Sequence, residues 1–376
     1  MKSRRIKMIT YTIIICIVFA PIPATGFEAS IVKESIVSQT ETDSLRRKPV
    51  NFLVLPIIFK SPDTGWAFGA LPQAVYRTGS SQHPSSVRVD AYYTQKNQYH
   101  FLLRSTNWFH GDRTNVDGKL SLKKWPTFYY GIGNDTPASL KESFTENLLE
   151  GSLQGIRRIG KNWYAGANYS MRYGEIRELN GEGLVSQNFP GGSNEIFTSG
   201  LAAIFRFDTR DHHFFPTRGF FHNVEVYTAL KALASDYAFT TITADLRMYV
   251  PLHPSHSMAV QVFSVTGTGD MPFRQLPSVG SVLRGYSNVR HIDKNLALLQ
   301  AEYRFVPVMW RVGFVVFAGA GDVFNHPGDI ELNKLKYNGG LGIRYQFSRE
   351  EKINIRADYG VGRKTAGDYI DLGEAF

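Results

Sequence analysis

The sequence predicts an all-β fold: a transmembrane antiparallel β-barrel of about 16 strands that spans residues 50–376. The first observation is a repeated run of roughly ten residues in which apolar and polar side chains alternate. Each run is followed by Gly, Asn, Asp or Pro. The second is that no apolar stretch after residue 26 approaches the roughly 18 residues of a membrane-spanning helix. The third is a composition with 13% aromatic residues and 34 glycines, which suits a barrel with one face on lipid and one on water.

The first 26 residues have the features of a secretory signal peptide. Basic residues lie between Lys2 and Lys7, an apolar run extends from Met8 to Ala20, and small residues precede Phe27. A membrane anchor is the alternative, but this apolar run is shorter than the roughly 20 residues that a spanning helix requires. We therefore expect cleavage before Phe27, export, and a location in the outer membrane of a Gram-negative bacterium.

Cleavage would also remove Cys16, the one cysteine of the chain, so that no disulfide could form in the mature protein. It would change the charge balance from 42 basic and 33 acidic residues to 38 and 33. That surplus is too small to indicate a nucleic-acid partner. Residues 27–49 are polar and too few for a domain, so we expect a periplasmic linker there.

Alternation is clearest near the end of the chain. Between Ile353 and Val361, apolar residues interleave with charged and polar ones such as Arg356 and Asp358. Successive side chains of a strand point to opposite faces, so one face of this strand is apolar and the other is polar. A polar barrel interior accepts ionisable groups at mid-strand depth. A secreted β-sandwich is the alternative, but each of its sheets needs a protein core partner.

The count of alternating runs is even, as a single-chain barrel with both ends on the periplasmic side requires. The predicted strands lie near residues 50–60, 65–77, 86–95, 98–109, 114–124, 144–158, 161–174, 196–208, 219–230, 236–250, 257–267, 294–305, 311–321, 336–348, 352–362 and 368–376.

Three segments differ from this background of strands and turns. The first joins two strands and contains Asp208, Arg210, Asp211, Pro216 and Gly219. The second is a long Gly- and Pro-marked segment that contains Leu283, Arg284, Gly285 and Tyr286. The third is the predicted last strand, from Tyr369 to the aromatic Phe376.

Together, these segments resemble the BamA/TamA superfamily of outer-membrane assembly and translocation barrels, the bacterial surface antigen family. The resemblance covers residues 195–376 well and the earlier strands by pattern. It implies that a loop with an Arg-Gly-Phe/Tyr motif folds into the barrel between the eleventh and twelfth of sixteen strands. The predicted strands place Leu283, Arg284, Gly285 and Tyr286 in that interval. The resemblance also implies that Tyr369 and Phe376 belong to a signal that the barrel-assembly machinery reads.

An arginine inside a barrel needs an acidic or carbonyl partner. The family places an aspartate on the thirteenth strand in a Phe-x-Asp-x-Gly pattern, but this chain has Gly319 at that position. A solvated loop arginine is the alternative to a paired one. The candidate partners of Arg284 are Glu302, Asp358, Asp245 and Asp322.

The resemblance implies a non-enzymatic barrel that assists the insertion or export of proteins or lipids. Its partners would be outer-membrane lipid, unfolded outer-membrane or exported proteins, and the assembly machinery for its own insertion. The chain resembles the subgroup without polypeptide-transport-associated domains. The family mechanism implies a weak seam between the first and last strands. Pro56 and Pro72 would weaken hydrogen bonding in the first two strands.

Two other function classes remain open. The first is a passive pore or structural barrel, and the second is a barrel-embedded hydrolase. We predict no cofactor, metal or catalytic set, because the histidine clusters lie beside prolines or at turns. In an extended chain, adjacent residues such as His212 and His213 point apart, which is poor metal geometry.

Overall fold

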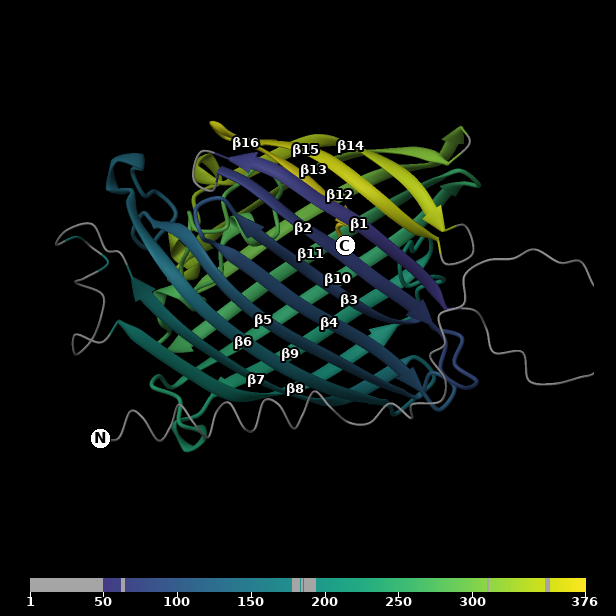
Figure 1. Cartoon of the computed structure of the whole chain (residues 1–376), viewed down its shortest axis with the longest axis horizontal. Helices are drawn as coiled ribbons and strands as arrows, with labels where there is room; N and C mark the ends of the chain where they lie inside the picture. Colours follow the sequence, from purple (N-terminus) through teal and green to yellow (C-terminus); the bar gives the residue numbers. More distant parts are fainter. Residues whose placement is uncertain are drawn as a thin grey trace, which may run out of the picture. The chain divides into compact units, whose positions relative to one another are not determined.

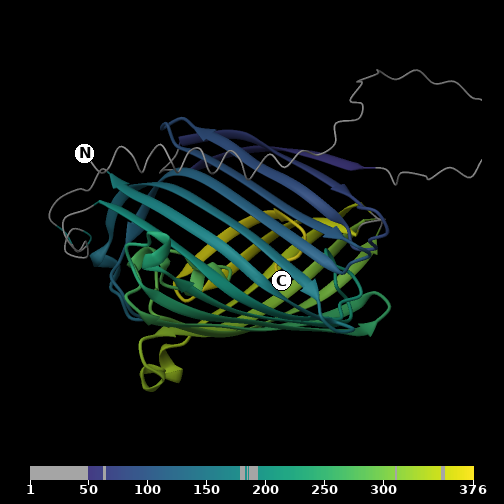
Figure 2. The same ribbon diagram turned by 90° about the horizontal axis from the view of Figure 1, so that it is seen from below.

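The computed structural model describes residues 50–61, 65–177, 183, 185, 194–309, 311–348 and 352–376. The expected signal peptide, 1–26, and the expected linker, 27–49, lie outside the described residues. Sixteen strands form one sheet, and each strand pairs antiparallel with its neighbour in the sequence. This confirms the predicted fold class and strand number. Figures 1 and 2 show the tilted strands that curve around the barrel.

The strands are β1 (Asn51–Ser61), β2 (Gly65–Tyr76), β3 (Ser85–Thr94), β4 (Tyr99–Phe109), β5 (Thr114–Tyr129), β6 (Glu142–Arg158), β7 (Trp163–Arg177), β8 (Glu195–Asp208), β9 (Gly219–Ala229), β10 (Phe239–His253), β11 (His256–Gly269), β12 (Asn295–Met309), β13 (Val312–Phe324), β14 (Lys336–Ser348), β15 (Ile353–Gly362) and β16 (Thr365–Leu372). The loops contain the short 3₁₀ helices η1 (Ala138–Leu140), η3 (Lys231–Leu233), η4 (Phe273–Gln275), η5 (Val279–Ser281), η6 (Pro327–Asp329) and η7 (Leu332–Lys334). No helix in the described ranges is long and apolar enough to cross a membrane.

Alternation of side chains separates an apolar outer face from a polar interior. On β14, Leu341 is 65% exposed on the outer surface, whereas Arg344 is buried inside. The same alternation recurs on β15, where Tyr359 is exposed and Asp358 is buried. Because lipid solvates the outer face, these exposed apolar side chains need no protein partner. The interior therefore holds the charges that the sequence pattern assigned to it.

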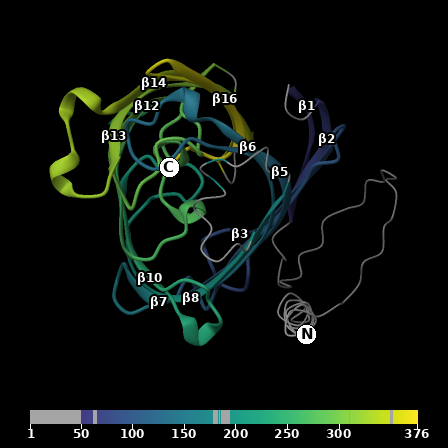
Figure 3. The same cartoon turned by 90° about the vertical axis from the view of Figure 1, so that its left-hand side faces the viewer.

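The strands β1 and β16 are the two edges of the sheet. The strand order runs from β1 to β16, and no ladder joins these two strands within the described residues. Figure 3, which looks along the barrel, shows them at the two ends of the curved sheet. In the β1–β2 ladder, Pro56 lies opposite Ala70 and Pro72 lies opposite Val54. Each proline lacks the N–H that donates to a ladder.

The last strand differs from the prediction. Residues 368–376 were expected to form it, but β16 spans Thr365–Leu372. At Gly373 the backbone has φ of +85°, which a glycine adopts without the strain of a Cβ atom. The chain then turns away from the ladder, and Phe376 is buried beside Tyr249 and Ala259 on the interior face of β10 and β11. Burial of the aromatic ring favours this turn over a longer strand.

Candidate functional site in the barrel interior

The long loop between β11 and β12 occupies the interior of the barrel, as the family resemblance implied, and it follows the eleventh strand, as the predicted strand count indicated. Its residues contact two separate parts of the interior wall, at β6 and at β12, and Figure 3 shows the loop within the curve of the strands. Leu283 is fully buried in a cluster with Val279, Tyr286 and residues of β12 and β13. The residue directly before Arg284 is therefore anchored in an apolar cluster.

Arg284 is clamped between two carboxylates. Its Nη2 atom donates to Oε1 of Glu302 on β12 over 2.5 Å, and its Nη1 atom donates to Oδ2 of Asp358 on β15 over 2.7 Å. The guanidinium carbon lies 3.5 Å from the ring centroid of Phe317 on β13. The Arg284 side chain is 5% exposed, and both carboxylates are buried. Buried charges need hydrogen-bonded partners of opposite charge, and Arg284, Glu302 and Asp358 supply them to one another.

The tip of the loop packs directly against the backbone of β15. Gly285 has φ of +96°, and a Cβ atom there would lie 2.9 Å from the nitrogen of Gly362. A Cβ atom on Gly360 would lie 2.9 Å from the main-chain carbon of Arg284. Glycine is therefore required on both sides of this contact, on the loop and on the strand. The interior face of β15 thus offers a carboxylate at Asp358 followed by two glycines.

Hydrogen bonds with three further residues hold the same tip. The Gly285 N–H donates to the hydroxyl of Tyr369 on β16 over 2.7 Å. The Asn338 amide on β14 donates to the Arg284 carbonyl oxygen over 2.7 Å, and the Tyr286 hydroxyl donates to the Tyr337 carbonyl oxygen over 2.8 Å. Contacts to β12, β13, β14, β15 and β16 thus converge on the loop tip.

Two of the four candidate partners contact Arg284, and two do not. Glu302 and Asp358 contact the guanidinium. Asp245 pairs with Arg247 on its own strand, and Asp322 accepts a hydrogen bond from Asn134. Asp245 and Asp322 do not reach Arg284 because they lie on other parts of the interior wall.

The glycine at position 319 leaves no room for an aspartate. A Cβ atom there would lie 2.8 Å from Cβ of Gln300 and 2.9 Å from Cδ2 of Leu283. The leucine of the loop motif thus fills the space, and the carboxylate comes from β15. A sequence signal for this exists: Asp358-Tyr359-Gly360 repeats the Asp-x-Gly part of the family pattern two strands later.

Arg304 links the loop site to the other two segments that the sequence singled out. Its guanidinium binds the second oxygen of Glu302, with Nε to Oε2 at 2.9 Å. It also donates to the main-chain oxygens of Pro216, over 3.3 Å, and Phe376, over 2.8 Å. Arg304 is fully buried, so these oxygens replace its water shell. Arg304 could not be recognised from the sequence, because its contacts involve three segments that meet only in the folded chain.

The turn between β8 and β9 is held by its own acidic residues. Asp208 forms two bonds to the Arg210 guanidinium, at 2.9 and 2.7 Å. Asp211 accepts from the main-chain N–H groups of Thr217 and Arg218, at 2.9 and 3.1 Å. Gly219 has φ of +104°, which favours glycine at the start of β9. The predicted turn residues therefore shape one compact turn, and Pro216 presents its carbonyl to Arg304.

Two histidines pack together beside this turn. The rings of His83 and His213 lie 4.1 Å apart, centroid to centroid, and both contact Trp108. Burial lowers the pKa of His213 well below its usual value, and the nearby Arg210 lowers it further. Burial likewise lowers the pKa of His83, against the opposing effect of Asp112. Both imidazoles are therefore neutral at pH 7.

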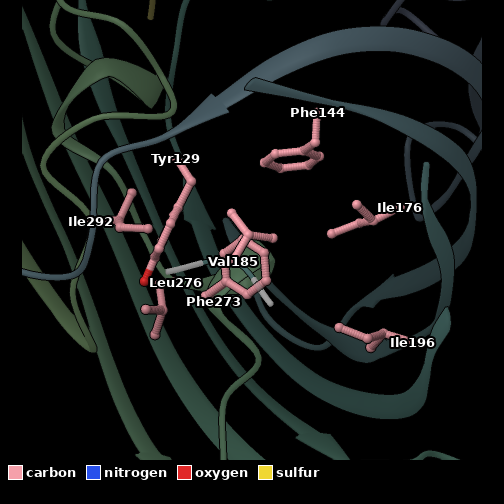
Figure 4. Packing of buried hydrophobic residues seen from close by; sticks show 8 residues of the cluster. All are labelled: Tyr129, Phe144, Ile176, Val185, Ile196, Phe273, Leu276 and Ile292. Atoms are coloured by element: carbon pink, nitrogen blue, oxygen red, sulfur yellow. The ribbon is translucent and has the colours of Figure 1, made fainter. Parts of the chain in front are cut away.

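A second anchor fixes the start of the loop to the opposite wall. Arg274 bonds to Glu146 on β6, with Nη2 to Oε2 at 2.5 Å, and Arg172 on β7 bonds to the other carboxylate oxygen at 2.6 Å. Figure 4 shows Phe273 and Leu276 packed in the adjoining apolar cluster. The remaining members of that cluster are Tyr129, Phe144, Ile176, Val185, Ile196 and Ile292. The loop is therefore anchored at its start on one wall and at its tip on another.

The arrangement suits mechanical support of the loop. Asp358 is shared by Arg284, Arg344 and Arg356, and Glu302 is shared by Arg284 and Arg304. Shared carboxylates bind chain segments together, and loss of one partner leaves a buried charge uncompensated. In the described part of the chain, no group of three His, Cys, Asp or Glu side chains is placed to hold a metal ion.

Comparison with solved structures supports the same architecture. BamA from Haemophilus ducreyi lacking POTRA domains 1–3 superposes with a TM-score of 0.53 at 15% identity, covering 86% of this chain and 68% of that one. CdiB from Acinetobacter baumannii gives 0.54 at 14% identity, covering 87% and 60%. CdiB from Escherichia coli gives 0.54 at 10% identity, covering 88% and 63%. This chain thus spans less than two thirds of either CdiB chain. These likenesses show the fold.

A search of curated protein sequences gives no match. The family model described as the Omp85 superfamily domain matches residues 83–371, which is most of the barrel and includes the three segments around Arg304 except the last five residues. The expected resemblance to BamA-type outer-membrane barrels is thereby confirmed, and this chain belongs to the Omp85 superfamily.

Proposed function

We propose that this protein assists the insertion or secretion of other proteins at the outer membrane, and that it does so at the seam between β1 and β16. The observation that carries the proposal is the sheet itself, whose two edges are not joined by a ladder in the described residues. An exposed strand edge presents main-chain N–H and C=O groups that can pair with an incoming strand. A substrate strand would therefore find a template at the seam.

The interior loop supports this proposal because its tip rests on the strands next to one edge. Gly285 bonds to Tyr369 on the edge strand β16, and Arg284 is fixed to Asp358 on β15. Ordered support behind β15 and β16 would keep this side of the seam in place. The β1 side would then be the more mobile one, with Pro56 in β1 and Pro72 in β2 each removing a donor.

Reconstitution tests the proposed function. The purified barrel is placed in liposomes, an unfolded outer-membrane β-barrel protein is added, and its folded fraction is followed by resistance to protease and by heat-modifiable gel mobility. We expect faster folding than in liposomes that contain an unrelated 16-stranded porin. Equal rates in the two would refute an insertion activity, and the same liposomes would then be tested for translocation of an exported protein.

A seam-locked variant identifies the route. One cysteine on β1 and one on β16, introduced after Cys16→Ser, are joined by a thiol-reactive crosslinker. The locked barrel should lose the rate gain, and reduction of a cleavable crosslinker should restore it. Activity that survives the lock would place the route elsewhere.

A passive pore is the second candidate, and one observation favours it. The interior is not wholly filled, since a cavity of about 450 Å³ lies beside Arg172 and Arg274. Planar-bilayer recordings separate the two functions. A large steady conductance would support the pore, whereas a low conductance is expected if the anchored loop obstructs the interior.

A further inference from the structure

We propose that the ion pair between Arg88 and Asp371 is a latch that holds the β1–β3 end of the sheet to the edge strand β16 from inside the barrel. The inference rests on the proposed function, in which the seam between β1 and β16 opens. Nη1 of Arg88, on β3, lies 2.8 Å from Oδ1 of Asp371, on β16. In the strand order, β3 follows β1 and β2, so this contact crosses the seam and reaches past both of these strands.

The ladders alone do not explain this contact. On the side away from the seam, β16 pairs with β15, from Ile355 opposite Leu372 to Gly362 opposite Thr365. On the opposite side of the seam, β3 is connected to β1 through β2. An ion pair between β3 and β16 therefore joins two parts of the sheet that no ladder joins within the described residues.

Packing beside the ion pair is incomplete. A cavity of about 150 Å³ lies between the interior wall of β2–β4 and the end of β16. Gln73, Ser86 and Arg88 line it on one side, and Leu372 and Gly373 line it on the other. The ion pair between Arg88 and Asp371 therefore bridges the two parts beside a space that side chains do not fill.

The burial of the pair suits a contact that opens. The Arg88 side chain is 14% exposed and the Asp371 side chain is 33% exposed. Partly exposed ion pairs are weakened by salt and contribute modestly to stability. Arg88 also bonds to Asp90 on its own strand at 2.7 Å, so it keeps a carboxylate partner when Asp371 moves away. Opening therefore leaves no isolated arginine charge on β3.

The latch is connected to the interior loop by alternating charges. Oδ2 of Asp371 lies 3.4 Å from Nη2 of Arg356, and Nη1 of Arg356 lies 3.0 Å from Oδ2 of Asp358. Asp358 in turn is the partner of Arg284. Each step joins a guanidinium to a carboxylate. Displacement of the loop tip would release one oxygen of Asp358 to Arg356 and weaken the hold of Arg356 on Asp371. Arg88 and Asp371 are thus positioning residues through which the loop acts on the seam.

Pulsed electron paramagnetic resonance tests the latch. Spin labels are attached to cysteines at Val54 on β1 and Ile370 on β16, which are 49% and 80% exposed on the outer face. The native Cys16 is replaced by serine. The folded protein should show a main distance population, and Asp371→Asn should raise the population at longer distances about two- to fivefold. Asp371→Glu retains the charge and should restore most of the shorter population.

Salt and a second variant make the test specific. Added salt should lengthen the distance in the parent protein but change Asp371→Asn little. Arg88→Gln should behave as Asp371→Asn does, and the double variant should add nothing. Arg88→Gln also serves if Asp371→Asn does not fold. The matched control is Asp245→Asn, which removes an interior ion pair with Arg247 away from the seam.

Two results would overturn the latch: an unchanged distance distribution in folded Asp371→Asn, or the same broadening in Asp245→Asn. The distance measurement does not depend on activity. A seam that responds in a barrel without insertion or secretion activity would therefore refute the proposed function and leave the latch standing. An active barrel with an unresponsive seam would do the reverse.

Discussion

Arg284 and Asp358 lie 74 positions apart in the sequence, and Nη1 of one donates to Oδ2 of the other over 2.7 Å inside the barrel. This bond ties the tip of the β11–β12 loop to the strand beside the edge strand β16. Glu302 completes the clamp from β12. The loop motif therefore contacts the last strands of the sheet, and the last of these, β16, borders the proposed seam.

The first prediction concerns the clamp itself. Asp358→Asn should weaken the hold on Arg284 and lower the free energy of local opening of residues 279–292 by about 3–5 kcal/mol, because a buried guanidinium loses its charged partner. Hydrogen exchange of the loop amides measures this opening. Asp245→Asn is the control, since Asp245 does not contact Arg284. Equal protection in Asp358→Asn and the parent protein would show that the pair does not hold the loop.

The second prediction concerns the glycines on β15 and β13. Gly360→Ala should displace the loop tip, because the new Cβ atom would lie 2.9 Å from the carbon of Arg284. Limited proteolysis of the loop should then become faster. Gly155→Ala on β6 is the control, because its Cβ atom would meet nothing within 4 Å.

The related Gly319→Asp variant restores the family pattern on β13. In an Asp358→Asn background it should still fail to restore loop protection, because Leu283 and Gln300 occupy the space. Recovery of protection would show that the clamp can move to β13 and that the packing around Leu283 is not decisive.

The third prediction separates the two anchors of the loop. Glu146→Gln removes the shared partner of Arg274 and Arg172, so residues 270–278 should lose hydrogen-exchange protection. The tip around Arg284 should keep its protection, because its contacts lie on the other wall. Loss of protection along the whole loop would mean that the two anchors form one cooperative unit. Lys119→Gln is a suitable control, because it removes a partly exposed pair with Glu150 nearby.

The fourth prediction concerns Phe376. Its ring is buried beside Tyr249 and Ala259, so Phe376→Ala should destabilise the folded barrel by about 3–5 kcal/mol through lost burial and the cavity left behind. Refolding into detergent without any assembly machinery measures this directly. A variant that is stable in detergent but accumulates poorly in cells would instead support the predicted role of Phe376 in a signal for the assembly machinery.

The fifth prediction is a loss of stability in acid. His213 has a folded pKa well below its unfolded value near 6.5, because burial disfavours the charged form. The unfolded state binds the proton first, so stability is complete above pH 6.5 and falls as the pH drops below it. Proteolysis of the 209–218 turn at a series of pH values would report this loss.

Nδ1 of His213 lies 3.2 Å from Nη2 of Arg210. An asparagine at position 213 keeps an acceptor near the position of Nδ1 but does not titrate. His213→Asn should therefore flatten the pH dependence of proteolysis. The control is His110→Asn, which changes an exposed histidine in another turn. An unaltered pH profile in His213→Asn would assign the acid sensitivity to other groups, such as His83, whose ring lies 4.1 Å away.

The strands could be predicted because the side chains of each strand alternate according to the two environments that the strand faces. Lipid on one side and charged interior on the other impose a period of two, which is visible in Leu341 and Arg344 on one strand and in Asp358 and Tyr359 on another. The loop position followed from counting such strands. The end of β16 was predicted wrongly because the strand was extended to the aromatic Phe376, whereas the turn at Gly373 depends on a binding surface for Phe376 that β10 and β11 provide.

By itself, the sequence determined the barrel, its strand number and the place of the Arg284 loop, because these depend on local periodicity and chain order. Only the tertiary structure decided that Glu302 and Asp358 bind Arg284, that Arg304 joins three distant segments, and that Arg88 meets Asp371 across the seam. The physical reason is that such pairings depend on how the curved sheet brings its interior faces together. Burial then requires every charge that meets there to find a partner, whatever its distance along the chain.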